Sequence, residues 1–299
     1  MSAPPLIAVV GPTAVGKSML AVRLAQRIGG EIVNADSMQI YRGMDIGTAK
    51  PTAAERQGVP HHLYDVWDVT EAASVAEYQR LALAAVAEIR GRGRIPVLVG
   101  GSGLYVRAVV DQIDFPGTDP DVRNRLEREL ADVGAQTLHR RLAGVDPAAA
   151  EAILPSNGRR IVRALEVIEI SGRPFSATLP SYDDRPGCRQ IGLDCVDLDP
   201  RIEARVDRMW ARGLVDEVTG LLAVGLREGR TASRALGYAQ VLDLLAGRCT
   251  ADEAREQTQL ATRRFARRQR SWLRRDPRVI WLSADSPTLE DEALRRTLD

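Results

Sequence analysis

The chain has 299 residues, of which 44% are hydrophobic and 27% charged, a composition typical of a globular protein with one large core or two smaller ones. The formal net charge of +1 excludes a basic surface spread over the whole molecule, so any nucleic-acid site has to come from local segregation of charge. Three scattered cysteines and three histidines complete no zinc-binding spacing, and no run approaches about 18 apolar residues, so we expect no structural metal, no membrane anchor and a cytoplasmic location.

A phosphate-binding motif follows the first predicted strand. The stretch GPTAVGKS, residues 11–18, fits the spacing G-x-x-x-x-G-K-[ST], in which backbone amides wrap phosphate oxygens, the lysine reaches the outer phosphates and the hydroxyl ligates Mg²⁺. A β-branched run, residues 6–10, comes before the motif, and a helical pattern, residues 19–28, comes directly after it. The context therefore predicts a diphosphate-binding loop that is completed by the positive end of a helix.

The second predicted strand, residues 31–36, ends on an acid. That acid, Asp36, could be a Mg²⁺ ligand, a general base for an incoming nucleophile, or a cap for the residues that follow. Its position beside the transferring phosphate favours the general base. The glycine-rich loop at residues 40–51 has little core periodicity, and we expect it to contact substrate.

Strand and helix patterns then alternate. Ser74 and Glu77 form a capping box at the start of a helical pattern that ends at GRGR, residues 91–94. Residues 95–101 form the pattern of another buried strand. This alternation predicts an α/β fold, a P-loop NTPase-like doubly wound parallel sheet whose ligands bind at the carboxyl ends of the strands.

A helical insertion interrupts the sheet pattern. The breaker FPGTDP begins at Phe115, helical patterns dominate as far as Ile170, and residues 188–198 have the pattern of a strand that returns to the sheet. We therefore expect a core domain of residues 1–114 and 187–299, and an inserted helical domain of residues 115–186.

The last part of the core domain is predicted to be mainly helical. Asp199 and Pro200 supply an N-cap and a first-turn proline for the next helix. A capping box at Thr250 opens a long helix that runs toward Arg275, and residues 278–282 form a final strand pattern.

Arginines are concentrated on the long helix. Seven of them lie between Arg263 and Arg275 without an intervening acid, which indicates a polyanionic partner. One face carries the series Arg263, Arg267, Arg270 and Arg274, and the opposite face carries Ala261, Phe265 and Trp272.

Two further arginine pairs lie elsewhere in the chain. In the insertion, Arg159 and Arg163 stand one turn apart just after a predicted helix start, a position suited to phosphate contacts. Arg201 and Arg205 form an i, i+4 pair after the returning strand. The pattern leaves open whether this second pair reaches the phosphate loop or forms ion pairs with neighbouring acids.

Several stretches together carry a resemblance to a known family. They are GPTAVGKS, NADSMQIYRGMDIGTAKP, LVGGSGLY, GRRIVRALEV, ALGYAQ and TRRFARRQRSWLRR. In this order, across most of the chain, they resemble the bacterial tRNA dimethylallyltransferases, also called tRNA isopentenyltransferases. The resemblance implies transfer of a dimethylallyl group from dimethylallyl diphosphate to N6 of the adenosine just 3′ of the anticodon, with Mg²⁺ as cofactor. Nothing in the sequence forces an oligomer, and we expect a monomer.

The resemblance also implies roles for individual residues. Asp36 matches the family's catalytic aspartate, and Lys17 would neutralise the leaving diphosphate. Ser102, which stands where the family commonly has threonine, is expected to be the third catalytic residue. Contacts to the diphosphate are expected from Gly11, Thr13, Ala14, Val15, Gly16, Lys17, Ser18 and Arg205, with Ser18 also the metal ligand. Contacts to the tRNA anticodon stem-loop and its flipped adenosine are expected from Asp36, Ser37, Met38, Gln39, Ser102, Arg123, Arg159, Arg160, Ile161, Val162, Arg163, Arg267 and Arg270.

Three other functions fit parts of the same sequence. A small-molecule kinase would use the loop for ATP and Asp36 to activate a hydroxyl, but it leaves the arginine-rich elements unexplained. A prenyltransferase acting on free adenine nucleotides would not need the insertion or the basic helix. An NTP-switched RNA-binding protein would use the arginines but would give Asp36 no task.

Overall fold

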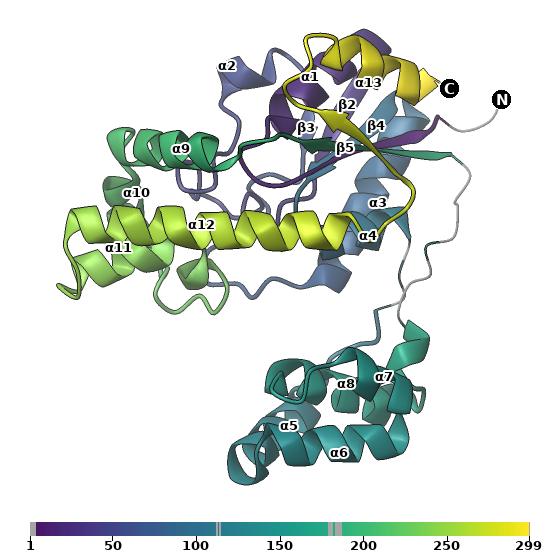
Figure 1. Cartoon of the computed structure of the whole chain (residues 1–299), viewed down its shortest axis with the longest axis vertical. Coiled ribbons are helices and arrows are strands. Elements are labelled where there is room, and N and C mark those ends of the chain that lie inside the picture. The colour runs from purple at the N-terminus through teal and green to yellow at the C-terminus, as the bar shows by residue number, and fades with distance from the viewer. Residues whose placement is uncertain (1–3, 112, 114, 179–181, 183–186, 299) are drawn as a thin grey trace. The chain divides into compact units, whose positions relative to one another are not determined.

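The computed structural model describes residues 4–111, 113, 115–178, 182 and 187–298 (Figure 1). It divides into two compact units, one made of residues 1–110 and 182–299 and the other of residues 111–181. The sequence had placed the limits of the insertion at residues 115 and 186, a few residues later at each end.

The larger unit is built on one parallel sheet. In the described part of the chain, six strands pair in the order β3-β2-β4-β1-β5-β6, and every pairing is parallel. The strands are β1 (Leu6–Val10), β2 (Gly30–Asn34), β3 (His61–His62), β4 (Ile95–Gly100), β5 (Cys188–Asp194) and β6 (Val279–Ser283). The predicted doubly wound parallel sheet is confirmed.

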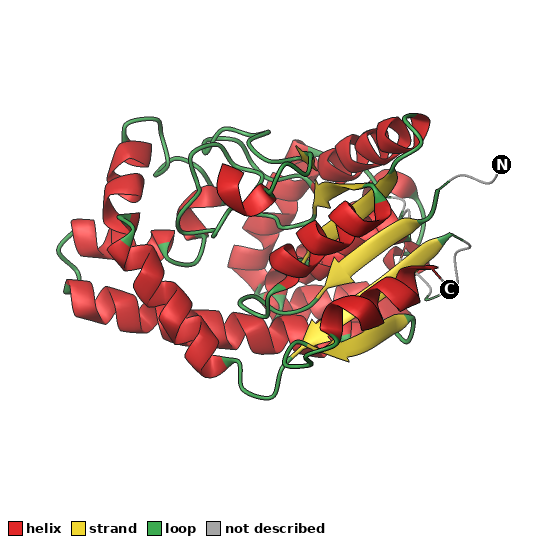
Figure 2. Cartoon of the chain, turned by 90° about the horizontal axis from the view of Figure 1, so that it is seen from above, coloured by secondary structure: helices red, strands yellow, loops and turns green. Residues whose placement is uncertain are grey.

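Helices cover both sides of this sheet (Figure 2). Among them, α1 and α13 pack together on the side that is uppermost in Figure 1, and α12 lies below the sheet. The helices of this unit are α1 (Lys17–Ile28), α2 (Ala53–Arg56), α3 (Val75–Gly91), α4 (Gly103–Val110), α9 (Asp199–Ala211), α10 (Leu214–Leu222), α11 (Tyr238–Leu245), α12 (Ala251–Leu273) and α13 (Leu289–Leu298), with a 3-10 turn, η2 (Ala232–Arg234). The β-branched strand residues between these layers form the core, which explains the unbroken apolar runs in the sequence.

The long helix α12 buries a different side from the predicted one. Its buried residues are mostly small or polar: Ala254, Thr258, Thr262, Ala266, Gln269 and Leu273. Phe265 and Trp272 are only partly buried. Because α12 packs against both α9 and α11, it needs short side chains where the helix axes come close, and the hydrophobic pattern alone did not reveal this.

The insertion is a small helical unit with a core of its own. It consists of α5 (Pro120–Val133), α6 (Ala135–Val145), α7 (Pro147–Ala152), α8 (Gly158–Ser171) and a 3-10 turn, η1 (Phe175–Thr178). Leu126, Leu142 and Leu165 are among the residues that pack in its centre. Asp119 and Asn157 cap α5 and α8 with their side chains, as residue types preferred at helix starts do.

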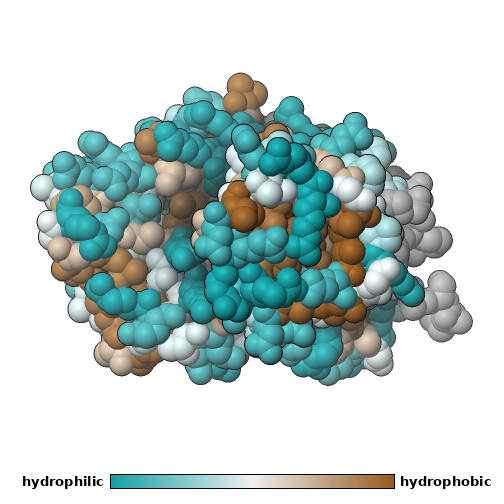
Figure 3. Space-filling model, turned by 90° about the horizontal axis from the view of Figure 1, so that it is seen from below, coloured by the Kyte–Doolittle hydropathy of each residue, from teal (hydrophilic) through white to brown (hydrophobic). Residues whose placement is uncertain are grey.

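Within the described residues, no helix has the length and apolar character that a membrane crossing requires. Hydrophilic side chains occupy much of the face shown in Figure 3, with hydrophobic patches between them.

Candidate active site

The phosphate loop connects β1 to α1 and has the backbone geometry that its glycines allow. Gly16 has a φ of 101°, and a Cβ at Gly11 would lie 2.5 Å from the carbonyl oxygen of Leu193. The backbone N–H of Thr13 donates to Oε1 of Gln269 at 2.8 Å, and Nε2 of Gln269 donates to the carbonyl of Gly101 at 2.9 Å. Gln269, which the sequence analysis missed, therefore ties the loop to the end of β4.

Two cations meet at this loop. Nζ of Lys17 donates to the carbonyl of Pro12 at 2.6 Å, and Nη1 of Arg205 donates to Oγ1 of Thr13 at 2.8 Å. Burial and the charge of Arg205 lower the pKa of Lys17 to about 7, although the charge of Asp36 acts in the opposite direction. Burial also lowers the pKa of Arg205, against the charge of Asp36. Since two half-buried like charges destabilise each other, the site favours an anionic ligand between them.

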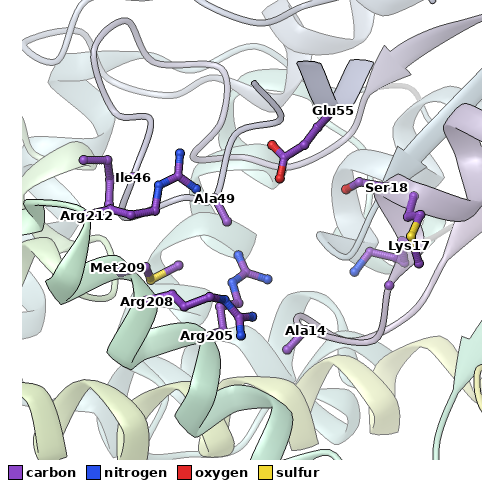
Figure 4. Close-up of a pocket in the computed structure, with 12 residues that line it drawn as sticks. Ala14, Lys17, Ser18, Ile46, Ala49, Glu55, Arg205, Arg208, Met209 and Arg212 are labelled. Atoms are coloured by element: carbon purple, nitrogen blue, oxygen red, sulfur yellow. The ribbon is translucent and has the colours of Figure 1, made fainter. Parts of the chain in front are cut away.

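A cavity of about 260 Å³ opens beside the loop. Figure 4 shows Lys17 and Ser18 on one side of it and arginines of α9 across from them. It is lined by Ala14, Gly16, Lys17, Ser18, Met19, Ile46, Ala49, Glu55, Arg205, Arg208, Met209 and Arg212. Four of these side chains are basic and one is acidic, and Met19, Ile46 and Met209 are apolar. The cavity therefore suits an anion that also carries an apolar group. We call it the phosphate-loop cavity.

The sequence left open whether Arg201 and Arg205 reach the phosphate loop or form ion pairs with acids, and in the structure the two arginines have different partners. Arg205 reaches the phosphate loop, whereas Arg201 pairs with the carboxylate of Asp285 at 2.5 Å. Arg208 and Arg212, which we did not predict, follow Arg205 at i+3 and i+7 on the same helix face. That spacing was a signal that could have found them.

Asp36 lies just beyond the end of β2. Its backbone N–H donates to Oδ1 of Asn34 at 2.9 Å, and its own Oδ1 accepts the N–H of Met38 at 2.9 Å. Among the described residues, the other carboxylate oxygen, Oδ2, has no hydrogen-bond donor. The charge of Asp36 acts on both Lys17 and Arg205, which places the three predicted residues in one electrostatic site.

Three tyrosines also lie within the electrostatic reach of Asp36. Burial, as the main cause, together with the negative charge of Asp36 raises the pKa of Tyr64, Tyr78 and Tyr105. These hydroxyl groups therefore stay neutral.

The residues after Asp36 are held by neighbouring side chains. The N–H of Ser37 donates to Oγ of Ser102 at 3.2 Å, so the Ser102 hydroxyl contacts this turn. Nε2 of Gln39 donates to the carbonyls of Thr48 and Ala49 at 3.0 and 3.1 Å. Gln39 is buried, whereas Ser37 and Met38 are partly exposed beside Asp36.

In the insertion, two predicted RNA-contacting arginines bind a carboxylate of the protein. Glu166 is fully buried and accepts hydrogen bonds from Arg123 and Arg163. Burial raises the pKa of Glu166, but these hydrogen bonds outweigh it and hold the pKa below its ordinary value. Arg163 also donates to the carbonyls of Pro116 and Gly117. Both arginines thus stabilise the insertion, and their contact with RNA stays a prediction.

The other predicted RNA contacts, at the start of α8, differ in their exposure to solvent. Arg159 and Arg160 are exposed. The side chains of Ile161 and Val162 are instead buried in the core of the insertion, so they are not available at its surface. Amphipathic periodicity explains the difference, because residues 161 and 162 fall on the apolar side of α8.

On α12, the arginine series that we assigned to a polyanion meets acids from distant parts of the chain. Arg270 and Arg274 both pair with Asp194, at 2.6 and 2.8 Å, and Arg263 pairs with Glu203 at 2.7 Å. Arg267 is 68% exposed and lies 3.7 Å from Asp199. These four arginines therefore do meet acids in the fold, although none lies within their own stretch of sequence, and their contact with RNA stays a prediction. The exposed cations of this helix are Arg264, Arg267 and Arg268, and Arg274 and Arg275 directly after it are also exposed.

A family model described as IPP transferase matches residues 39–276. The chain is 69% identical over 283 residues to a tRNA dimethylallyltransferase of Streptomyces coelicolor, covering 94% of this chain and 91% of the relative. It is 65% identical over 295 residues to the enzyme of that name in Thermobifida fusca, covering 96% and 92%.

The fold is also similar to solved structures of transferases of this kind. The chain is similar to the tRNA isopentenylpyrophosphate transferase of Bacillus halodurans, with 43% identity, a TM-score of 0.71 and coverage of 98% and 94%. It is also similar to a eukaryotic dimethylallyltransferase acting on tRNA, with 26% identity, a TM-score of 0.82 and coverage of 99% and 77%.

Proposed function

The chain belongs to the IPP transferase family, and we propose that it transfers a dimethylallyl group from dimethylallyl diphosphate to N6 of the adenosine 3′-adjacent to the anticodon, position 37, of tRNA. Diphosphate is the other product. The observation that carries this proposal is that the charge of Asp36 acts on Lys17 and Arg205, two cations that line the phosphate-loop cavity. The names of the similar proteins support the same donor group and the same acceptor.

The phosphate loop would bind the diphosphate of the donor and stabilise it as it leaves. Breaking the allylic C–O bond leaves negative charge on the diphosphate, and Lys17 and Arg205 are placed to neutralise that charge. The apolar side chains of Met19, Ile46 and Met209 in the same cavity suit the hydrocarbon part of a donor.

Mg²⁺ is part of this proposal. Within the described residues, no cluster of three or more His, Cys, Asp or Glu side chains could hold a metal ion by itself. Mg²⁺ commonly binds through substrate phosphates, waters and one or two protein oxygens, and the Ser18 hydroxyl on the cavity wall fits that donor set. When bound there, Mg²⁺ would help to neutralise the diphosphate.

Asp36 would act as the general base. The N6 amino group of adenine is a weak nucleophile because its lone pair is delocalised into the ring, so removal of its proton assists attack on the allylic carbon. Oδ1 of Asp36 is fixed by the N–H of Met38, which leaves Oδ2 to accept the N6 proton. The adenosine has to leave its stack to reach this oxygen, as bases that undergo chemistry do.

The exposed arginines are the proposed contacts for RNA. On the insertion these are Arg159 and Arg160, and on α12 they include Arg264, Arg267 and Arg268. Their guanidinium groups would bind backbone phosphates, whereas the flipped adenosine and unpaired loop bases would give specificity. We propose that the enzyme works as a monomer in the cytoplasm.

The direct test is transfer of label from radioactive dimethylallyl diphosphate, with Mg²⁺, to an unmodified tRNA anticodon stem-loop. A matched stem-loop with guanosine in place of the adenosine at position 37 and a reaction with free AMP serve as controls. Label on the adenosine stem-loop alone is the expected result. Label on AMP would favour a free-nucleotide prenyltransferase, and no label with tight ATP binding would favour a kinase.

A further inference from the structure

The loop of residues 45–49, called here the 45–49 loop, has a carboxylate at its base that the proposed chemistry does not use. Glu217, in the first turn of α10, accepts the backbone N–H groups of three consecutive loop residues. The N–O distances are 3.1 Å for Asp45, 2.7 Å for Ile46 and 3.2 Å for Gly47. Three successive N–H groups that converge on one anion form a nest, an arrangement that many proteins use for phosphate.

A tyrosine completes the set of donors to this carboxylate. The hydroxyl of Tyr238, at the start of α11, donates to Oε1 of Glu217 at 2.5 Å. Tyr238 is fully buried, and burial with the nearby charge of Glu217 raises its pKa, so the hydroxyl remains a donor. A carboxylate offers about four acceptor sites, and Glu217 receives four donors.

The aromatic ring of Tyr238 also contacts the 45–49 loop directly. A Cβ at Gly47 would lie 2.4 Å from Cε2 of Tyr238 and 2.8 Å from Cδ1 of Leu214, which is closer than real side chains allow. Gly47 is therefore required because the ring packs on its backbone. The ALGYAQ stretch, which the sequence analysis quoted without assigning a task, supplies this tyrosine.

The far side of the same loop forms part of the phosphate-loop cavity. Ile46 and Ala49 line it, and the carbonyl of Thr48 accepts Nη2 of Arg205 at 3.2 Å. Glu217 and Tyr238 do not line the cavity. A continuous path of contacts thus runs from Glu217 through the loop to Arg205, and from Arg205 to the phosphate loop at Thr13.

We propose that Glu217, assisted by Tyr238, is a positioning residue for the donor diphosphate: it fixes the 45–49 loop so that Ile46, Ala49 and Arg205 keep the cavity in its binding geometry. This inference rests on the proposed function for the identity of the donor. Glutamine at position 217 would retain one acceptor oxygen but turn an NH₂ group toward N–H donors. The loop would then lose its common anion, and the hydrogen bonds from Gln39 and Arg205 would be left to hold the Thr48 carbonyl.

The test compares Glu217→Gln with Asp216→Asn. Asp216 is exposed on the same first turn of α10, so both substitutions remove one negative charge at the same helix end. For each variant we would measure the dissociation constant of inorganic diphosphate with Mg²⁺, the KM for dimethylallyl diphosphate, the KM for the tRNA stem-loop and the Tm. The Glu217→Gln variant should weaken both diphosphate constants about tenfold, the effect of losing one charge-assisted hydrogen bond. Its KM for tRNA should equal that of Asp216→Asn.

Equal diphosphate constants in the two variants would overturn the inference, and so would a change confined to the KM for tRNA. If Glu217→Gln gives no folded protein, Tyr238→Phe takes its place, with an expected weakening of about threefold in the same constants. No weakening in that variant would equally refute a positioning role. Failure of the wild-type protein to label tRNA would refute the proposed function instead, and binding of inorganic diphosphate would still decide the role of Glu217.

Discussion

The titration of Lys17 predicts how diphosphate affinity depends on pH. Burial, together with the charge of Arg205, lowers the pKa of Lys17 from 10.5 to about 7 in the ligand-free protein. A bound diphosphate favours the charged amine. Above about pH 7 the protein must therefore take up a proton as it binds diphosphate, and the affinity falls by up to about tenfold for each pH unit.

Replacing Arg205 with leucine has two opposite consequences that the structure allows us to separate. The variant loses a guanidinium that points into the cavity, which should weaken diphosphate binding by about 10-fold to 100-fold at neutral pH. It also loses the second-largest cause of the lowered pKa of Lys17. The decline in affinity should therefore begin at a higher pH than in the wild-type protein.

Calorimetric titration with inorganic diphosphate and Mg²⁺ between about pH 6 and pH 9, in two buffers of different ionisation enthalpy, measures both the affinity and the protons taken up. A Lys17→Met variant is the control, because it reports only the ligand's own ionisation. Wild-type protein should take up more protons at pH 8 than this control does. Equal proton uptake would show that diphosphate binding does not change the protonation of Lys17, and the reasoning would be refuted.

The remaining predictions concern stability and RNA binding. Because the folded pKa of Lys17 lies below its unfolded value, its charge destabilises the ligand-free fold fully below about pH 7, and this effect disappears as the pH rises toward 10.5. Lys17→Met should consequently raise the Tm at pH 7 and raise it less at pH 9, and an equal gain at both would contradict this. Glu166→Gln should lower the free energy of unfolding by about 3 kcal/mol, measured by urea denaturation, because two arginines lose their common buried partner; an unchanged value would show that this ion-pair cluster contributes nothing. Arg267→Ala should weaken tRNA binding and flatten its salt dependence without changing Tm, whereas Arg270→Ala, which breaks contacts with Asp194 and Cys195, should lower Tm. Identical behaviour of these two variants in filter-binding and melting assays would refute the distinction.

The sheet and the phosphate loop could be predicted because their signals are local. Apolar runs mark the strands, and the loop is specified by eight successive residues, GPTAVGKS. Asp36 was found for the same reason, since it directly follows a strand beside that loop. Arg208 and Arg212 could have been found too, because they share a helix face with Arg205.

Contacts between distant residues could not be read from the chain. Asp194 lies 76 residues from Arg270, so a run of arginines with no acid between them in the sequence is nevertheless paired with an acid in the fold. Glu217 similarly binds a loop that is about 170 residues away. The buried side of α12 was missed because close approach of helices selects small residues, which carry little hydrophobic signal.

The most direct test of the whole account is single-turnover transfer by an Asp36→Asn variant, with saturating dimethylallyl diphosphate and tRNA stem-loop. Asparagine keeps the oxygen that accepts the N–H of Met38 but cannot take the N6 proton. The account predicts a transfer rate lower by about 100-fold or more, with the affinities for diphosphate and tRNA within about twofold of the wild-type values. Transfer at the wild-type rate would contradict the assignment of Asp36 as the base at this site.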